Sequence, residues 1–382
     1  MLHTALQLLC TGATLAACAF YLFAMLAAIR FFRRPLAHQS GEMQPVSILI
    51  PLCGADAGAY ENYVAFCRQA YPAYQIVFGV RDPLDAAVPI VRQLMANFPK
   101  RDIVLVICPK TIGSNLKVSN LYNMLERAKH EWIVIVDSDI RVDLSYLRSI
   151  MPLLADQRVG LVTCLYRGAQ APDVAARLEA IGITADFVPG VLAAWLLEGM
   201  HFALGATMAM TRTTLKAIGG LQAISDYLAD DFMLGNLIAK AGYEVCLASY
   251  VVEAMVAPMG FYGMLKHQLR WSRARRCARP LGYLGAVLTH GTALALLNLL
   301  VYRGGVPSLV LLGVTLSIRL GMAWLIGVHW LDDRVLKKSF WLLLPRDLLN
   351  FGIWCLGLVG KRVEWRGRLL EIIGGGKIVQ VR

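Results

Sequence analysis

The sequence predicts an α/β fold, in which a mostly parallel sheet flanked by helices is joined to one N-terminal and two to three C-terminal membrane segments. Hydrophobic residues make up 57% of the 382 residues, more than a typical soluble domain contains. The apolar excess is concentrated at residues 5–29 and after residue 280, and the chain between them has the mixed polarity of a globular domain. Within that globular region, short β-branched runs alternate with helix-like stretches, which is typical of βαβ units.

The first apolar segment, residues 5–29, is long enough to span a bilayer, which takes about 20 residues. No Lys or Arg precedes it, whereas Arg30, Arg33 and Arg34 follow it, the reverse of the charge order of a signal peptide. We therefore expect an uncleaved anchor over residues 1–34, and the positive-inside rule places the chain that follows in the cytoplasm.

Residues 35–260 are predicted to form the cytoplasmic domain. Its expected strands are "VSILIPL", "YQIVFGV", "DIVLVI" and "WIVIV", which begin at residues 46, 74, 102 and 132. Ligands of such sheets bind at the carboxyl ends of the strands. The second strand leads to Asp82, and the fourth leads to Asp137 and Asp139.

Asp137 and Asp139 are candidate metal ligands. Side chains two residues apart on an extended segment point the same way, so these carboxylates can converge on one object. A hard cation removes their repulsion, and Mg²⁺ usually takes one or two protein carboxylates together with substrate phosphates. A diphosphate substrate follows from this interpretation, but Asp-x-Asp alone fits a helix-capping turn equally well.

Two further stretches carry candidate site residues. In "IGSNLKVSN", residues 112–120, Asn115 and Lys117 lie in a predicted loop, where Lys117 would meet a phosphate or a uracil carbonyl. Asp231 lies at the start of a helix predicted from about residue 230. First-turn acids often only complement the helix dipole, but the apolar stretch before Asp231 would raise its basicity enough for a general base.

The stretch "FYGMLKHQLRWSRARRCARP" begins at residue 261 and reads as a basic amphipathic helix, so residues 261–283 are predicted to lie at the membrane interface. Arg270 and Trp271 lie in its middle, where Arg would offset charge on a leaving diphosphate. The net charge of +12 is gathered beside apolar segments, which fits an anionic membrane surface and no nucleic acid.

Residues 284–360 are the predicted C-terminal membrane segments, followed by a short basic tail, residues 361–382, with a hairpin turn at 374–376. Arg346 and Asp347 within the last segment are expensive in lipid. We therefore expect residues 340–350 to lie at the interface or to re-enter. The nine cysteines form no CxxC pair, so neither a disulfide framework nor a zinc site is indicated.

Together these motifs resemble the ceramide glucosyltransferase-like family of inverting, GT-A-type membrane glycosyltransferases. That family has a first Asp, a D-x-D-like second Asp, a third Asp in an acidic pair and a (Q/R)-x-x-R-W motif. The matching positions here are Asp82, Asp137, Asp231, and Arg270 with Trp271. The likeness covers about residues 1–283. His267 replaces the Gln or Arg of the last motif, and Ile50 stands where the family tends to have Lys, but the three aspartates are intact.

The resemblance implies a UDP-sugar donor and a membrane lipid acceptor. Asp82, Asn115, Lys117, Asp137 and His267 would contact the donor, and Asp137 with Asp139 would hold Mg²⁺ or Mn²⁺ on its diphosphate. Asp231 would deprotonate the lipid hydroxyl, assisted at the diphosphate by Arg270 and Trp271. The apolar residues 181–200 are a candidate acceptor wall or an ordinary core helix.

The wording of the first motifs is most similar to the bacterial branch associated with hopanoid biosynthesis. That branch implies transfer of N-acetylglucosamine to a hopanoid at a bacterial inner membrane, whereas the eukaryotic branch adds glucose to ceramide. A processive polysaccharide synthase is an alternative, although a channel would need more spans. A membrane-anchored binding protein that has lost activity is another, and the presence of Asp231 disfavours it.

Overall fold

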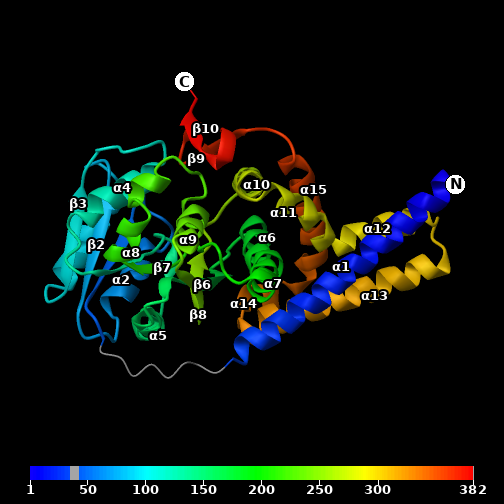
Figure 1. Cartoon of the computed structure of the whole chain (residues 1–382), viewed down its shortest axis with the longest axis horizontal. Coiled ribbons are helices and arrows are strands. Elements are labelled where there is room, and N and C mark those ends of the chain that lie inside the picture. Colours follow the sequence, from blue (N-terminus) through cyan, green and yellow to red (C-terminus); the bar gives the residue numbers. More distant parts are fainter. Residues whose placement is uncertain (35–42, 382) are drawn as a thin grey trace. The chain divides into compact units, whose positions relative to one another are not determined.

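The computed structural model describes residues 1–34 and 43–381. The chain forms two compact units, each assembled from three stretches of sequence (Figure 1). We call residues 36–166, 200–257 and 362–382 the sheet unit, and residues 1–35, 167–199 and 258–361 the helical unit. This division differs from the predicted boundaries, because residues 167–199 group with the helices and the C-terminal tail groups with the sheet.

The sheet unit is built on an eight-stranded sheet with the order β3-β2-β1-β4-β7-β6-β8-β5. The four predicted strands form its parallel half: β1 (Val46–Pro51), β2 (Tyr74–Val80), β3 (Asp102–Ile107) and β4 (Trp132–Ile135). In the register, Ile48 of β1 lies opposite Ile76 of β2 and Val134 of β4. Because β1 and β2 are buried along their whole length, they read as continuous apolar runs, and the predicted fold class is confirmed.

The other half of the sheet contains β5 (Ile140–Arg141), β6 (Val159–Ala169), β7 (Met208–Thr211) and β8 (Glu244–Met255). In it, β7 pairs antiparallel with β4, β6 pairs antiparallel with β7, and β5 pairs antiparallel with β8. Ile140 pairs with Ala254 immediately after the Asp137–Asp139 segment. That segment is therefore held between strands at both ends, which limits its freedom.

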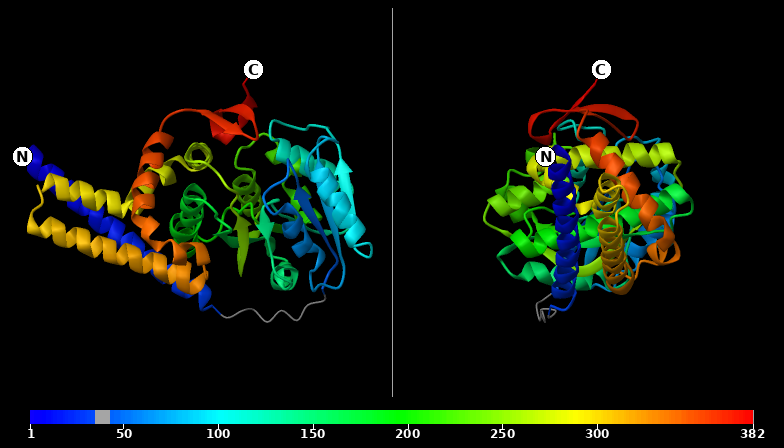
Figure 2. Two further views of the ribbon diagram at one scale, coloured as in Figure 1. Left: turned by 180° about the vertical axis from the view of Figure 1, so that it is seen from behind. Right: turned by 90° about the vertical axis from the view of Figure 1, so that its right-hand side faces the viewer.

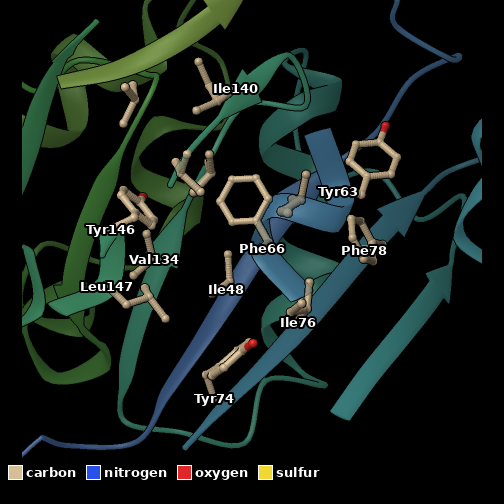
Figure 3. Close-up of a cluster of buried hydrophobic side chains, with 14 of the residues drawn as sticks. Ile48, Tyr63, Phe66, Tyr74, Ile76, Phe78, Val134, Ile140, Tyr146 and Leu147 are labelled. Atoms are coloured by element: carbon tan, nitrogen blue, oxygen red, sulfur yellow. The ribbon is translucent and has the colours of Figure 1, made fainter. Parts of the chain in front are cut away.

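Helices cover the sheet and supply its core. They are α2 (Ala59–Cys67), α3 (Ala87–Asn97), α4 (Leu116–Leu125), α5 (Tyr146–Ile150), α8 (Arg212–Ala217) and α9 (Asp230–Lys240). Figure 3 shows Phe66 of α2 and Tyr146 of α5 beside Ile48 and Val134, all of them members of one buried hydrophobic cluster. Packing of this kind fixes the strand ends that carry the polar residues.

The C-terminal tail forms a second, three-stranded antiparallel sheet: β9 (Arg362–Trp365), β10 (Arg368–Ile372) and β11 (Ile378–Gln380). The hairpin expected at residues 374–376 is confirmed, since β10 and β11 are joined there. The tail is bonded to the sheet unit, because the Leu228 N–H donates to Gly376 O at 3.2 Å and the Ile378 N–H donates to Asp226 O at 2.7 Å.

In the described residues, 1–34 and 43–381, three helices are long and apolar enough to cross a membrane, all of them in the helical unit: Leu2–Phe32, Val174–Glu198 and Val306–Trp330. A bent pair, Pro280–Thr289 and Gly291–Val301, would make a fourth if it is one broken span. Figures 1 and 2 show α1 (Leu2–Phe32) running beside α12 (Gly291–Val301) and α13 (Val306–Ala323).

The candidate span over Val174–Glu198 was not among the predicted membrane segments. It comprises α6 (Val174–Gly182), a π-helical turn (Ile183–Phe187) and α7 (Val188–Glu198). Its charged side chains Glu179 and Asp186 interrupt the apolar run, and it follows the sheet region directly in sequence. Most of residues 181–200, predicted as a candidate acceptor wall, therefore lie on one of the three described helices of membrane-spanning length.

The remaining helices of this unit are α10 (Phe261–Ala278), α11 (Pro280–Gly285), α14 (Arg334–Lys338) and α15 (Leu343–Gly357). The predicted basic helix is α10. At 15 residues, α15 is not one of the candidate spans in the described part of the chain. Arg346 and Asp347 on α15 are buried, and both make ion pairs or hydrogen bonds inside the protein.

Candidate active site

Three of the residues predicted for the site converge in the sheet unit. Lys117 of α4 places its Nζ 2.6 Å from Asp137 Oδ1 and 3.5 Å from Asp230 Oδ2. Gly205 lies between Asp137 and Asp231, because a Cβ on Gly205 would be 3.1 Å from Asp137 Oδ2 and 3.2 Å from Asp231 Oδ2. The second and third aspartates of the motif series are therefore neighbours in space, although 94 positions separate their numbers, 137 and 231.

Asp231 lies in the first turn of α9, with both carboxylate oxygens held by backbone groups. Its Oδ2 accepts the Gly205 N–H at 2.9 Å, and its Oδ1 accepts the Phe232 N–H at 2.7 Å. Burial and the neighbouring Asp230 raise the pKa of Asp231 to about 6, although Lys117 opposes the shift. A carboxylate whose pKa lies near neutrality is suited to accept a proton.

Asp139 lies in a cluster of carboxylates. Burial, Asp137 and Asp56 together raise the pKa of Asp139 to about 7. Asp56, which sequence analysis did not single out, accepts a hydrogen bond from Ser138 Oγ at 2.5 Å. Like charges at this density favour either a proton or a cation on the cluster.

The donor set fits a hard divalent cation that also binds substrate. Asp137 and Asp139 offer only oxygen ligands, which Mg²⁺ and Mn²⁺ prefer. Within residues 1–34 and 43–381, no three His, Cys, Asp or Glu side chains are grouped so as to hold a metal by themselves. A cation here would need phosphate oxygens or water in addition, which is the usual way that proteins bind Mg²⁺.

Lys117 stays protonated at this site. Burial lowers its pKa, but Asp137 and Asp230 outweigh that effect, and the net pKa is raised above the ordinary value. The sequence predicted a loop at residues 112–120, whereas the structure begins α4 at Leu116. Lys117 is consequently held on a helix, which fixes the position of its charge beside Asp137.

Asn115 has a positioning role in the sheet unit, and its contact with the donor stays a prediction. Its side chain is fully buried, its Oδ1 accepts the Val118 N–H at 3.1 Å as the N-cap of α4, and its Nδ2 donates to Tyr227 O at 2.8 Å. The amide is occupied by the protein on both sides. Asn115 therefore joins α4 to the segment that leads into α9.

Gly113 allows the same two segments to approach closely. A Cβ on Gly113 would lie 2.5 Å from Ser225 O, a separation that real Cβ atoms do not reach, and the Asn115 N–H donates to the same Ser225 O at 2.8 Å. The loop before α4 and the loop before α9 are thus packed backbone to backbone. This contact sets the spacing between Lys117 and the two acidic residues at the start of α9, Asp230 and Asp231.

Asp82 lies at the carboxyl end of β2 and is exposed. Its Oδ1 accepts the Leu84 N–H at 2.9 Å, which closes a turn. Asp85, three residues on, accepts the Gly54 N–H at 2.9 Å and caps the start of α3. Contact between Asp82 and a nucleotide stays a prediction, and its exposure at the strand end is compatible with it.

The C-terminal tail contributes a residue that sequence reasoning missed. Arg366, in the turn between β9 and β10, places its Nη2 3.3 Å from Asp56 Oδ1. The tail "VEWRGRLLEIIGGGKIVQVR" predicted a small hairpin with its turn at residues 374–376. Neither the turn at Arg366 nor the surface that the tail covers was predicted. Asp56 and Arg366 are neighbours only through the tertiary fold.

His267, Arg270 and Trp271 lie on α10 in the helical unit. His267 Nδ1 is 2.7 Å from Glu179 Oε1, and the His267 and Trp271 rings have centroids 4.7 Å apart. Gln268, the next residue, donates from Nε2 to Glu179 Oε2 at 2.6 Å. The motif is therefore anchored to α6 through Glu179, and contact of these three residues with a donor stays a prediction.

The fold of the chain is shared with a solved glycosyltransferase. The mannosyltransferase PcManGT from Pyrobaculum calidifontis, solved in complex with GDP-Man and Mn²⁺, superposes with a TM-score of 0.57 at 18% identity, covering 92% of this chain and 97% of that one. At this identity the likeness shows the fold alone, and it agrees with the predicted GT-A architecture.

Proteins similar in sequence assign the chain to a family. The chain is 23% identical to ceramide glucosyltransferase 3 of Caenorhabditis elegans over 368 residues, covering 89% of this chain and 75% of that protein. It is 22% identical to ceramide glucosyltransferase 1 of the same organism, covering 87% and 72% respectively. The profile of glycosyl transferase family 21 matches residues 9–378. Because that match spans nearly the whole chain, the protein belongs to glycosyl transferase family 21 and is a sugar-transferring enzyme.

Proposed function

We propose that this enzyme transfers a hexose, N-acetylglucosamine or glucose, from a UDP-sugar to a lipid hydroxyl with inversion at the anomeric carbon. The observation that carries the proposal is the convergence of Asp137, Asp231 and Lys117 around Gly205. Its support from relatives is that the two worm proteins are named ceramide glucosyltransferases. The acceptor class we propose is a hopanoid or a ceramide.

On the donor side, we propose that Asp82 contacts the nucleotide and that Asp137 and Asp139 hold Mg²⁺ or Mn²⁺. When bound, the cation would neutralise charge on the diphosphate of the donor. Lys117 keeps one positive charge beside Asp137. We assign Arg270 and Trp271 to the same leaving group on the strength of the motif, with His267 in place of the usual Gln or Arg.

On the acceptor side, Asp231 is the proposed general base. The Gly205 and Phe232 N–H groups hold its two oxygens, which orients the carboxylate before the substrate arrives. Asp231 takes the proton of the lipid hydroxyl as the lipid oxygen bonds to the anomeric carbon. The bond from that carbon to UDP breaks, its electron pair leaves with UDP, and one displacement inverts the centre.

We propose that the enzyme is a multi-pass membrane protein with the sheet unit in the cytoplasm, in a bacterial inner membrane. Support comes from the three helices of spanning length and from the basic residues Arg30, Arg33 and Arg34 at the end of the first. The candidate span over Val174–Glu198 includes most of residues 181–200, and we propose that this helix lines the lipid path.

A transfer assay on the purified chain in detergent tests the proposal. UDP-glucose and UDP-N-acetylglucosamine are each offered with ceramide and with a polyhydroxylated hopanoid, with and without EDTA, and Asp231→Asn is the control. We expect one donor and acceptor pair to give product that EDTA abolishes, that added Mn²⁺ or Mg²⁺ restores, and that the variant does not form. Binding of the UDP-sugar without any turnover would instead indicate an inactive binding protein, and a polymeric sugar product would indicate a polysaccharide synthase.

A further inference from the structure

The turn between β9 and β10 has an unusual residue at a constrained position. Arg366 and Gly367 form a two-residue hairpin loop, and both have positive φ, +49° and +75°. Such a turn strongly prefers Asn-Gly or Asp-Gly, because the left-handed region is unfavourable for longer side chains. A residue kept in a disfavoured backbone conformation is a candidate for a functional role.

The Arg366 side chain points into the carboxylate cluster of the site. Its Nη1 and Nη2 lie 3.4 and 3.3 Å from the same oxygen, Asp56 Oδ1. The other oxygen of Asp56 accepts the Ser138 hydroxyl at 2.5 Å. Ser138 stands between Asp137 and Asp139, so the guanidinium is placed next to the predicted metal ligands.

Arg366 retains hydrogen-bonding capacity in this arrangement. A guanidinium has five N–H donors, and within residues 1–34 and 43–381 its hydrogen bonds are the two long ones to a single Asp56 oxygen. The side chain is 49% exposed. It can therefore accept an anion from solvent without losing a tightly bonded partner.

A pair of arginines in the sheet unit, Arg81 and Arg368, also favours an anion near this turn. Arg81 lies at the end of β2, and Arg368 lies at the start of β10. Burial lowers the pKa of Arg81, and the positive charge of the nearby Arg368 lowers it further. Arg81 donates from Nη2 to Pro109 O and Thr111 Oγ1, each at 2.6 Å. Its Nε is buried and has no hydrogen-bond partner in the described part of the chain.

The C-terminal sheet is attached by backbone hydrogen bonds to the segment that enters α9. Two backbone hydrogen bonds join residues 376–378 to Asp226 and Leu228, and Lys377 Nζ lies 5.6 Å from the centre of the Tyr227 ring. The same segment is bonded to the loop before α4, since the Ser114 N–H donates to Asp226 Oδ1 at 2.8 Å. The C-terminal sheet, whose turn carries Arg366, is thus bonded to the segment before α9, and that segment is bonded to the loop before α4.

We infer that Arg366 binds the diphosphate of the nucleotide-sugar donor, and that the C-terminal sheet is a wall of the donor site. When the donor binds, the guanidinium exchanges its long contacts with Asp56 for phosphate oxygens, to which an Arg can make two parallel bonds. Asp56 keeps its hydrogen bond from Ser138. This inference rests on the proposed function, because it assumes a nucleoside diphosphate donor.

Calorimetric titration of the full chain in detergent, with Mn²⁺ present, tests the inference. UDP is titrated directly, and uridine is measured by competition against UDP, for the wild type, Arg366→Gln and Arg366→Lys. The matched control is Arg158→Gln, which removes an exposed guanidinium paired with Asp156 at 2.7 Å in the same unit. We expect Arg366→Gln to weaken UDP binding by about tenfold or more and to leave uridine within about twofold, because the lost bonds are charge-assisted and go to phosphate.

Arg366→Lys keeps the positive charge but loses the planar guanidinium that can make two parallel bonds. We therefore expect it to weaken UDP binding by a smaller factor than Arg366→Gln does, and it replaces Arg366→Gln in the test if that variant does not fold.

Asp56→Asn distinguishes ligand binding by Arg366 from a purely structural ion pair between Arg366 and Asp56. We expect it to keep or raise UDP affinity, since it frees the guanidinium. Equal loss of UDP affinity in Asp56→Asn and Arg366→Gln, or unchanged affinity in Arg366→Gln, would overturn the inference. Failure of the wild type to bind UDP would overturn the proposed function itself.

Discussion

Asp231 is the residue whose titration most directly controls the proposed chemistry. Burial and Asp230 raise its pKa to about 6, so the carboxylate loses its basic form as the pH falls through that value. We expect the rate of transfer to rise between pH 5 and pH 7 with a midpoint near 6, measured as initial rates at saturating donor and acceptor. A rate that does not change across this range would exclude Asp231 as the base.

The same shift predicts that Asp231 destabilises the folded protein. Its folded pKa is above its unfolded value, so ionisation disfavours the native state increasingly as the pH rises from about 4 to about 6, and by a constant amount above that. Asp231→Asn should therefore abolish transfer. It should also raise stability at pH 7.5 by about 1 kcal/mol, because raising the pKa from about 4 to about 6 is worth about 3 kcal/mol, and the Asn NH2 group leaves one of the two backbone N–H groups unpaired at a cost of about 1 to 3 kcal/mol. Thermal melting at pH 4.5 and pH 7.5 measures the difference, which should be larger at pH 7.5. A variant less stable than wild type at pH 7.5 would contradict this assignment.

Gly205 is a residue at which one methyl group should matter. A Cβ there would lie 3.1 and 3.2 Å from oxygens of Asp137 and Asp231, which would push the two carboxylates apart. We expect Gly205→Ala to lower kcat by about tenfold or more, since small misplacements of catalytic groups are costly. Gly313→Ala is the control, because nothing lies within 4 Å of its added Cβ. Equal activity of both variants would show that the carboxylates do not need this spacing.

Among the elements, α10 is held by a buried chain of charged and polar groups. From α10, Gln268 contacts Glu179 and accepts a bond from Arg346 Nη2 at 3.1 Å. Arg346 Nε is 3.1 Å from Asp186, which is also 2.7 Å from Arg319 Nη2. This chain ties the predicted Arg270 and Trp271 motif to helices α6, α13 and α15 of the helical unit.

The pairing of Arg319 and Asp347 should be essential to that chain. Arg319 Nη2 lies 2.6 Å from Asp347 Oδ1, and both side chains are at most 6% exposed. Removing one partner leaves a buried charge uncompensated, so Arg319→Met should destabilise the protein by about 3 to 5 kcal/mol. Arg319→Met with Asp347→Leu should recover a substantial part of the loss. Thermal melting in detergent compares the variants, and a double variant no more stable than the single one would argue against the pairing.

The buried charges also explain why the sequence was ambiguous at residues 340–350. Arg346 and Asp347 suggested an interfacial or re-entrant segment, because isolated charges are expensive in lipid. In the structure, both charges have partners on other helices. Partners distant in sequence are invisible to a local window, so hydropathy could not weigh that compensation.

At the scale of the whole molecule, the chain returns to the sheet unit at its end. Residues 362–382 belong with the sheet, after more than a hundred residues of the helical unit. The predicted tail was assigned no role, whereas the structure places Arg366 beside Asp56. Residues 167–199 show the converse, since they follow the sheet in sequence but group with the helices.

The parallel strands, the helices between them and the positions of the aspartates were predictable from the sequence alone. β1, β2, β3 and β4 were predictable because strands buried on both faces are local apolar runs, and polar residues at their carboxyl ends mark a ligand-binding edge. The fold class and the family follow from these features together with the order of the motifs.

The choice of groups that share the site depends on the tertiary structure. Asp56, Gly205 and Arg366 lie in turns and loops whose local sequence carries no periodic signal, and their contacts join positions far apart in the chain. Asn115 was predicted to contact the donor, and the structure adds that its amide joins two segments distant in sequence. The propensity of a segment to form a helix or a strand depends on residues close in sequence, whereas the convergence of charged side chains depends on the packing of the whole unit.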